Sequence, residues 1–225
     1  VGPEDDLSIQ VHPDDEHAQK IGYKRGKNEA WFFIESDPGA SIVYGQKTKN
    51  KEELQEMINQ DKWDDIYKKY PVADGDFVYL PAGCLHAMGK GNVVYEIQQS
   101  TDITYRFYDY HRKDKDGNER ELHLKQAIDC LSFDKDIDKN DVHPVVKVHE
   151  NMKETIFISN DSFTVSQLLV IGKCQYKCDN YQLATVVKGS GKVDEYDVKV
   201  GDNFLIPTNT SIELDGQMMI MMTTK

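Results

Sequence analysis

Residues 75–86 read GDFVYLPAGCLH, and this stretch decides the fold. Gly75 and Asp76 make a turn, an apolar strand follows, and Pro81 ends that strand because proline cannot donate a hydrogen bond to a sheet. The turn after Pro81 leads back toward the interior of the domain. The imidazole of His86 is therefore predicted to point inward.

A second stretch, residues 201–212, reads GDNFLIPTNTSI and repeats the same template. Both copies contain Gly-Asp, an apolar run, and a proline six positions after the glycine. The position of His86 in the first copy is occupied by Ile212 in the second. The repeat predicts two related domains, of which only the first can place a metal ligand at this position.

Short strands separated by turn signals dominate the rest of the chain. Alternating or apolar runs predict strands at 7–12, 29–36, 40–44, 76–80, 93–99, 103–110, 155–159, 163–170, 182–187, 192–198, 202–206 and 217–223. Helical spacing appears within 50–70, with a capping-box start at Asn50 and Glu53, and again at 123–131. This pattern predicts a β-sandwich or barrel.

The template Gly-x₅-Pro-x-Gly-x₂-His resembles the second conserved motif of the cupin superfamily. Residues 75–86 match it at every specified position, whereas residues 201–212 match it only in part. The resemblance implies an all-β double cupin, with two jelly-roll barrels and small helical insertions. We expect a metal-binding catalytic cupin at 1–110, a loop, short helix and linker at 111–141, and a degenerate cupin without a metal site at 142–225.

Composition limits the classes of partner. The 225 residues carry a formal net charge of −12, which disfavours nucleic acid and anionic membranes as partners. We find no apolar run approaching the roughly 18 residues of a membrane span, and no signal-peptide pattern at the start. The four cysteines form no Cys-x-x-Cys pair and are expected as free thiols. A cytoplasmic monomer or weak homo-oligomer is the expectation.

Four polar residues form a candidate metal site. Gln10 and His12 lie two apart on a predicted strand and would share a face, and Glu29 begins the next strand. A jelly roll can bring them to His86 inside the barrel. Two imidazoles, a carboxylate and an amide oxygen suit a borderline cation such as Zn²⁺.

Several stretches together resemble the type I mannose-6-phosphate isomerase family in its short bacterial form. The matching segments are LSIQVHPDD at 7–15, GKNEAW at 26–31, PAGCLHA at 81–87 and EIQQSTDITYR at 96–106. The resemblance implies one zinc ion per chain, a catalytic Arg106, and Lys27 and Glu96 lining the active site. The implied reaction interconverts mannose 6-phosphate and fructose 6-phosphate through a cis-enediol.

Two departures from the family pattern are present. Gly26 stands where the longer enzymes have a histidine before the lysine, so a ring-opening role for that histidine does not transfer. The Gln-Val-His-Pro strand also starts close to residue 1, which suggests a fragment or a processed form. Three alternatives stay open: another metal-dependent cupin such as a dioxygenase, a non-catalytic sugar-phosphate-binding cupin, and a storage cupin.

Overall fold

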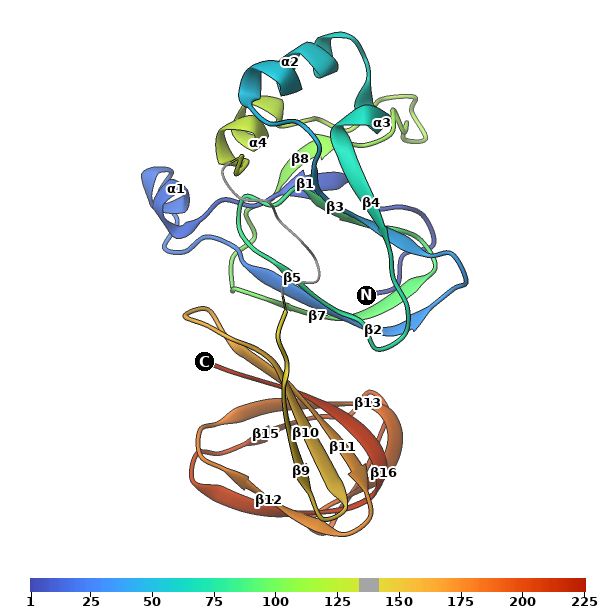
Figure 1. Cartoon of the computed structure of the whole chain (residues 1–225), viewed down its shortest axis with the longest axis vertical. Helices are drawn as coiled ribbons and strands as arrows, with labels where there is room; N and C mark the ends of the chain where they lie inside the picture. Colours follow the sequence, from blue (N-terminus) through green and yellow to red (C-terminus); the bar gives the residue numbers. More distant parts are fainter. Residues whose placement is uncertain (134–141) are drawn as a thin grey trace. The chain divides into compact units, whose positions relative to one another are not determined.

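A computed structural model describes residues 1–133 and 142–225 of the chain. The chain forms two compact units, Val1–Asp141 and Val142–Lys225, each built mainly of strands (Figure 1). Residues 134–141, part of the predicted linker, lie outside the described residues. Within the described ranges, no helix has the length and apolar character needed to cross a membrane. All four cysteines are free thiols, as expected.

The first unit contains two antiparallel sheets. One has the strand order β4-β3-β6-β1-β8 and the other has the order β5-β2-β7. The strands are β1 Ile9–Val11, β2 Glu29–Ser36, β3 Ser41–Gln46, β4 Tyr67–Pro71, β5 Phe77–Leu80, β6 His86–Met88, β7 Asn92–Gln98 and β8 Tyr105–Tyr108. The helices are α1 Asp15–Lys20, α2 Lys51–Asn59, α3 Trp63–Ile66 and α4 Leu124–Cys130.

Apolar side chains cover both faces of the five-stranded sheet. On the inner face, residues of both sheets such as Trp31, Ile42 and Leu80 pack into one cluster. On the outer face, Ile9 and Phe107 belong to a second cluster that α2, α3 and α4 cover (Figure 1). Because side chains alternate along a strand, β1 directs Ile9 and Val11 toward the helices and Gln10 toward the interior.

The helical insertion is shorter than predicted. The side chain of Asn50 accepts a hydrogen bond from the Glu53 amide at 2.8 Å, which confirms the predicted start of α2. The helical part ends at Ile66, however, and residues 67–70, predicted as part of the helical insertion, begin the strand β4. Tyr67 is buried, residues 68–70 are half-buried or exposed, and the backbone of this segment pairs with β3. Pairing with β3, which lies more distant in the sequence, therefore outweighs the local helical spacing of these residues.

The loop after β8 is fixed by a buried carboxylate. Asp109 contacts the guanidinium groups of Arg112 and Arg120. Burial alone raises the pKa of Asp109, but the two arginines outweigh burial and hold that pKa below its usual value. Tyr110 and His111 adopt left-handed backbone angles, with φ of 56° and 53°, so this ion cluster stabilises a strained turn. The loop returns to α4, which packs against β8 within the first unit.

The second unit forms one larger antiparallel sheet with the path β14-β13-β16-β11-β10-β9, while β12 pairs with β16 and β15 pairs with β13. The strands are β9 Val145–His149, β10 Met152–Ser159, β11 Thr164–Ile171, β12 Cys174–Cys178, β13 Gln182–Val193, β14 Tyr196–Lys199, β15 Asn203–Ile206 and β16 Thr210–Thr224. Ile212, the counterpart of His86, lies buried in an apolar cluster with Leu168, Val186 and Ile220. The strands β9 and β12 are absent from the sequence prediction.

Candidate metal centre

Three strands, β1, β2 and β6, position the four predicted ligands. Gln10 on β1 lies directly opposite His86 on β6, so both side chains share the inner face of the sheet. Glu29 is the first residue of β2 in the opposing sheet. His12 lies one residue beyond β1, so the expectation that it sits on the strand beside Gln10 is wrong. Its position is fixed by two contacts distant in sequence: its carbonyl accepts a hydrogen bond from the Gly83 amide, and its ring contacts the Ile103 carbonyl.

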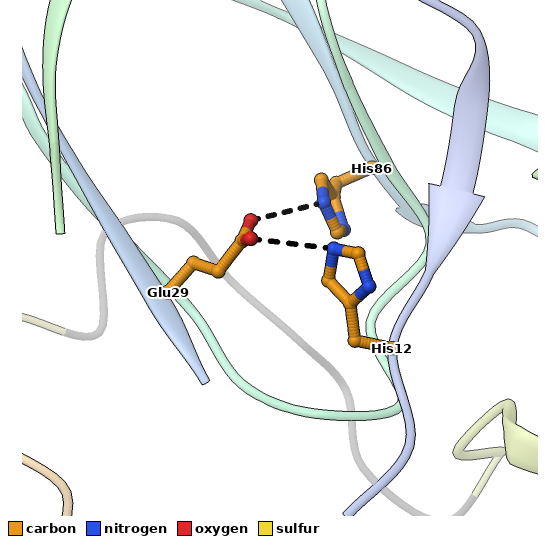
Figure 2. Close-up of side chains that lie close together, drawn as sticks. All are labelled: His12, Glu29 and His86. Carbon is orange, nitrogen blue, oxygen red and sulfur yellow. Dashed lines mark ion pairs between the residues drawn. The ribbon is translucent and has the colours of Figure 1, made fainter. Parts of the chain in front are cut away.

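The three ionisable side chains converge within the first unit (Figure 2). Nε2 of His12 lies 3.4 Å from Oε1 of Glu29, and Nε2 of His86 lies 3.3 Å from Oε2 of Glu29. Each of these side chains is at most 2% exposed. One ligand atom from each of the three residues lies within 4.8 Å of the others. This is the spacing of a metal-ligand cluster.

Backbone carbonyls determine which imidazole nitrogens face the centre. Nδ1 of His12 lies 2.8 Å from the Ile103 carbonyl oxygen, and Nδ1 of His86 lies 3.0 Å from the Cys84 carbonyl oxygen. A carbonyl only accepts, so both Nδ1 atoms carry a proton, and in a neutral ring the lone pair is then on Nε2. Burial lowers the pKa of His12 to about 4, which keeps its ring neutral at pH 7.

The centre therefore brings acceptors together. Among the described residues, Nε2 of His12 and Oε2 of Glu29 are buried without a hydrogen-bond partner. Nitrogen lone pairs and carboxylate oxygens that converge in this way can coordinate a cation, so these residues fit a metal ion.

Gln10 can complete the ligand set. Its amide nitrogen makes a long hydrogen bond of 3.4 Å with Nε2 of His86. The nitrogen and oxygen of an amide exchange places by rotation about the terminal bond. The amide oxygen of Gln10 can thus face the same point as the other three ligand atoms.

Lys27 lies beside the cluster. Its Nζ is 2.8 Å from Oε1 of Glu29, and its side chain is 9% exposed. The Lys27 amide donates to the Pro13 carbonyl at 3.0 Å, and the Gly26 amide donates to the Asp15 carboxylate at 2.8 Å. A Cβ on Gly26 would lie 2.4 Å from the Pro13 oxygen, so this loop has no room for a side chain where the longer enzymes have histidine.

Arg106 and Glu96 lie on strands that pair with the strands of Gln10 and Glu29. Arg106 on β8 is opposite Gln10, and its Nη1 donates to the Glu121 carbonyl at 2.8 Å. Glu96 on β7 accepts a hydrogen bond from the Trp31 indole at 3.0 Å, and the Trp31 ring packs edge-on against His86 at 5.6 Å between centroids. Trp31 is a site residue without an assigned role in the sequence analysis, although its spacing of two from Glu29 places both on one strand face.

Two facing sheets with this interior cluster define a cupin-type domain, and comparisons with known proteins agree. Residues 153–225, which belong to the second unit, match the family described as mannose-6-phosphate isomerase, cupin domain. The chain is 39% identical over 221 residues to mannose-6-phosphate isomerase of Streptococcus mutans, covering 96% of this chain and 69% of the relative. It is 38% identical over 211 residues to mannose-6-phosphate isomerase ManA of Bacillus subtilis, covering 90% and 65%. The chain spans about two thirds of the length of these relatives.

Solved structures extend the likeness. The crystal structure of mannose 6-phosphate isomerase from Bacillus subtilis matches with a TM-score of 0.92 at 31% identity, over 99% of this chain and 72% of that chain. A mutant phosphomannose isomerase from Salmonella typhimurium matches with a TM-score of 0.75 at 12% identity, over 100% of this chain and 77% of that one, which shows the shared fold. The chain belongs to the mannose-6-phosphate isomerase family, which is a family of isomerase enzymes. The expected family and the all-β cupin fold are confirmed.

Proposed function

We propose that this protein is a zinc-dependent aldose–ketose isomerase that interconverts mannose 6-phosphate and fructose 6-phosphate through a cis-enediol. The observation that carries the proposal is the buried cluster of His12, Glu29 and His86, whose acceptor atoms face one another in a chain of this family. Gln10 is the fourth proposed ligand. A Zn²⁺ ion held by these four residues would supply Lewis acidity toward the open-chain sugar.

The surrounding side chains divide the remaining tasks. A base removes the proton from C2 of the aldose, and the proton returns to C1. Lys27 and Glu96 are the candidates for moving it, and Lys27 is already held within 2.8 Å of the ligand Glu29. The guanidinium of Arg106 would stabilise the enediolate or hold the phosphate group.

The proposal includes the partner and the setting of the reaction. The substrate is a small hexose phosphate, which Arg106 and Lys27 can attract despite the net charge of −12. We also propose a cytoplasmic location and a monomeric or weakly self-associating chain that contacts neither nucleic acid nor membrane.

A coupled assay on mannose 6-phosphate tests the function. The protein is assayed as purified, after chelator treatment, and after Zn²⁺ is added back; activity should disappear with the chelator and return with zinc. His86→Ala should lose stoichiometric zinc and activity, whereas His111→Ala, which removes an exposed histidine of the same unit, should keep both. Substrate binding without turnover would favour a non-catalytic cupin, and full zinc content in His86→Ala would reject the ligand assignment.

A further inference from the structure

One amide side chain links the segments that carry the proposed ligands. Oδ1 of Asn28 accepts a hydrogen bond from the Ala82 amide at 2.8 Å, and its Nδ2 donates to Oε1 of Gln99 at 3.0 Å. Its own backbone amide donates to the same Gln99 oxygen at 2.9 Å, and its carbonyl accepts from the Gln99 amide at 3.0 Å. Asn28 thus joins the start of β2, the end of β7 and the turn after β5.

The turn at Ala82 and Gly83, which Asn28 contacts, leads directly to His86 at the start of β6. The Ala82 amide is bound by the Asn28 side chain, and the next amide, that of Gly83, donates to the carbonyl of His12 at 2.8 Å. Two consecutive amides of one turn are therefore fixed by the neighbour of Glu29 and by the ligand His12. The positions of three proposed ligands depend on one another through this turn.

We propose that Asn28 and Gln99 are positioning residues that set the distance between Glu29 and His86 and so tune the metal affinity of the centre. The proposal rests on the metal-dependent function proposed above. A metal site tolerates ligand distances only within about ±0.2 Å, so a small displacement of this turn would weaken metal binding. Residues that orient ligands in this way typically contribute about 10–100-fold in metal affinity.

Four variants of the full chain test the proposal. Asn28→Ala and Gln99→Ala remove the link, whereas Gln99→Glu keeps an oxygen acceptor for both hydrogen bonds from Asn28. Asn92→Ala is the matched control, because Asn92 is a buried amide on β7 that binds the Ser36 hydroxyl and the Gly89 carbonyl away from the centre. Zn²⁺ affinity is measured by competition with a chromophoric chelator, and Co²⁺ absorption reports the ligand geometry.

We expect Asn28→Ala and Gln99→Ala to weaken Zn²⁺ binding by about 10-fold or more and to change the Co²⁺ spectrum. Gln99→Glu should keep the wild-type Zn²⁺ affinity and Co²⁺ spectrum. Asn92→Ala should lower thermal stability but leave the Zn²⁺ affinity and the Co²⁺ spectrum unchanged. Wild-type Zn²⁺ affinity in Asn28→Ala, or an equal loss in Asn92→Ala and Asn28→Ala, would overturn the proposal. Both readouts need no sugar, so a wild-type chain that binds Zn²⁺ but lacks isomerase activity would reject the proposed function and leave this test intact.

Discussion

Replacing Glu29 by glutamine should affect stability and metal binding in separable ways. The substitution keeps the shape of the side chain but removes the charge that faces Lys27, His12 and His86. In the metal-free protein, Lys27 would lose the carboxylate at 2.8 Å while its side chain stays 9% exposed. A buried ammonium without a partner is unfavourable, so the metal-free variant should unfold more easily.

The structure gives the scale of this effect. At 2.8 Å and an effective dielectric constant of about 20, two unit charges attract by about 6 kcal/mol before desolvation is counted. Removing one partner of a buried pair typically costs about 3–5 kcal/mol, which is the expected destabilisation of metal-free Glu29→Gln. A double variant, Lys27→Met with Glu29→Gln, removes both charges and should recover most of that loss.

Denaturant unfolding followed by tryptophan fluorescence measures the effect within the first unit, because both tryptophans of the chain, Trp31 and Trp63, lie there. Zn²⁺ affinity measured in parallel should fall by about 100-fold or more, since a direct ligand outweighs the supporting residues. Wild-type stability in metal-free Glu29→Gln, or a double variant as unstable as the single one, would refute the reasoning.

Three further substitutions have distinct expected results. Arg106→Ala should retain zinc but lower turnover by about 10²–10³-fold in the coupled assay; unchanged turnover would remove this arginine from the mechanism. Gly26→Ala should destabilise the first unit by about 1–3 kcal/mol in denaturant unfolding, because its Cβ would lie 2.4 Å from the Asp14 backbone. Asp109→Asn should cost about 1–3 kcal/mol at pH 7. The folded pKa of Asp109 is depressed, so its contribution is present above about pH 4 and is lost as the pH falls through the folded pKa. The difference from wild type should therefore shrink in unfolding curves at acidic pH, and a constant difference would contradict this assignment.

Local pattern was sufficient for much of the fold. The run at residues 29–36, followed by the turn signal Asp37-Pro38-Gly39, predicted β2 with its observed bounds, and the capping pair Asn50 and Glu53 predicted the start of α2. Two short strands, β6 of three residues and β9 of five, escaped prediction. Residues 67–70 carried a helical spacing that pairing with β3 overrode.

The sequence by itself indicated three residues that the structure brings together, His12, Glu29 and His86, because the template around His86, the Gln-x-His spacing and the segment around Glu29 are short-range patterns of residue type. Only the tertiary structure decided how they act together. The carbonyls of Ile103 and Cys84 orient the imidazoles, and Asn28 links the turn to β2. The separation in sequence ranges from 2 to 91 residues, and each of the three contacts uses a backbone atom that residues of any type carry, so no pattern of residue types encodes them.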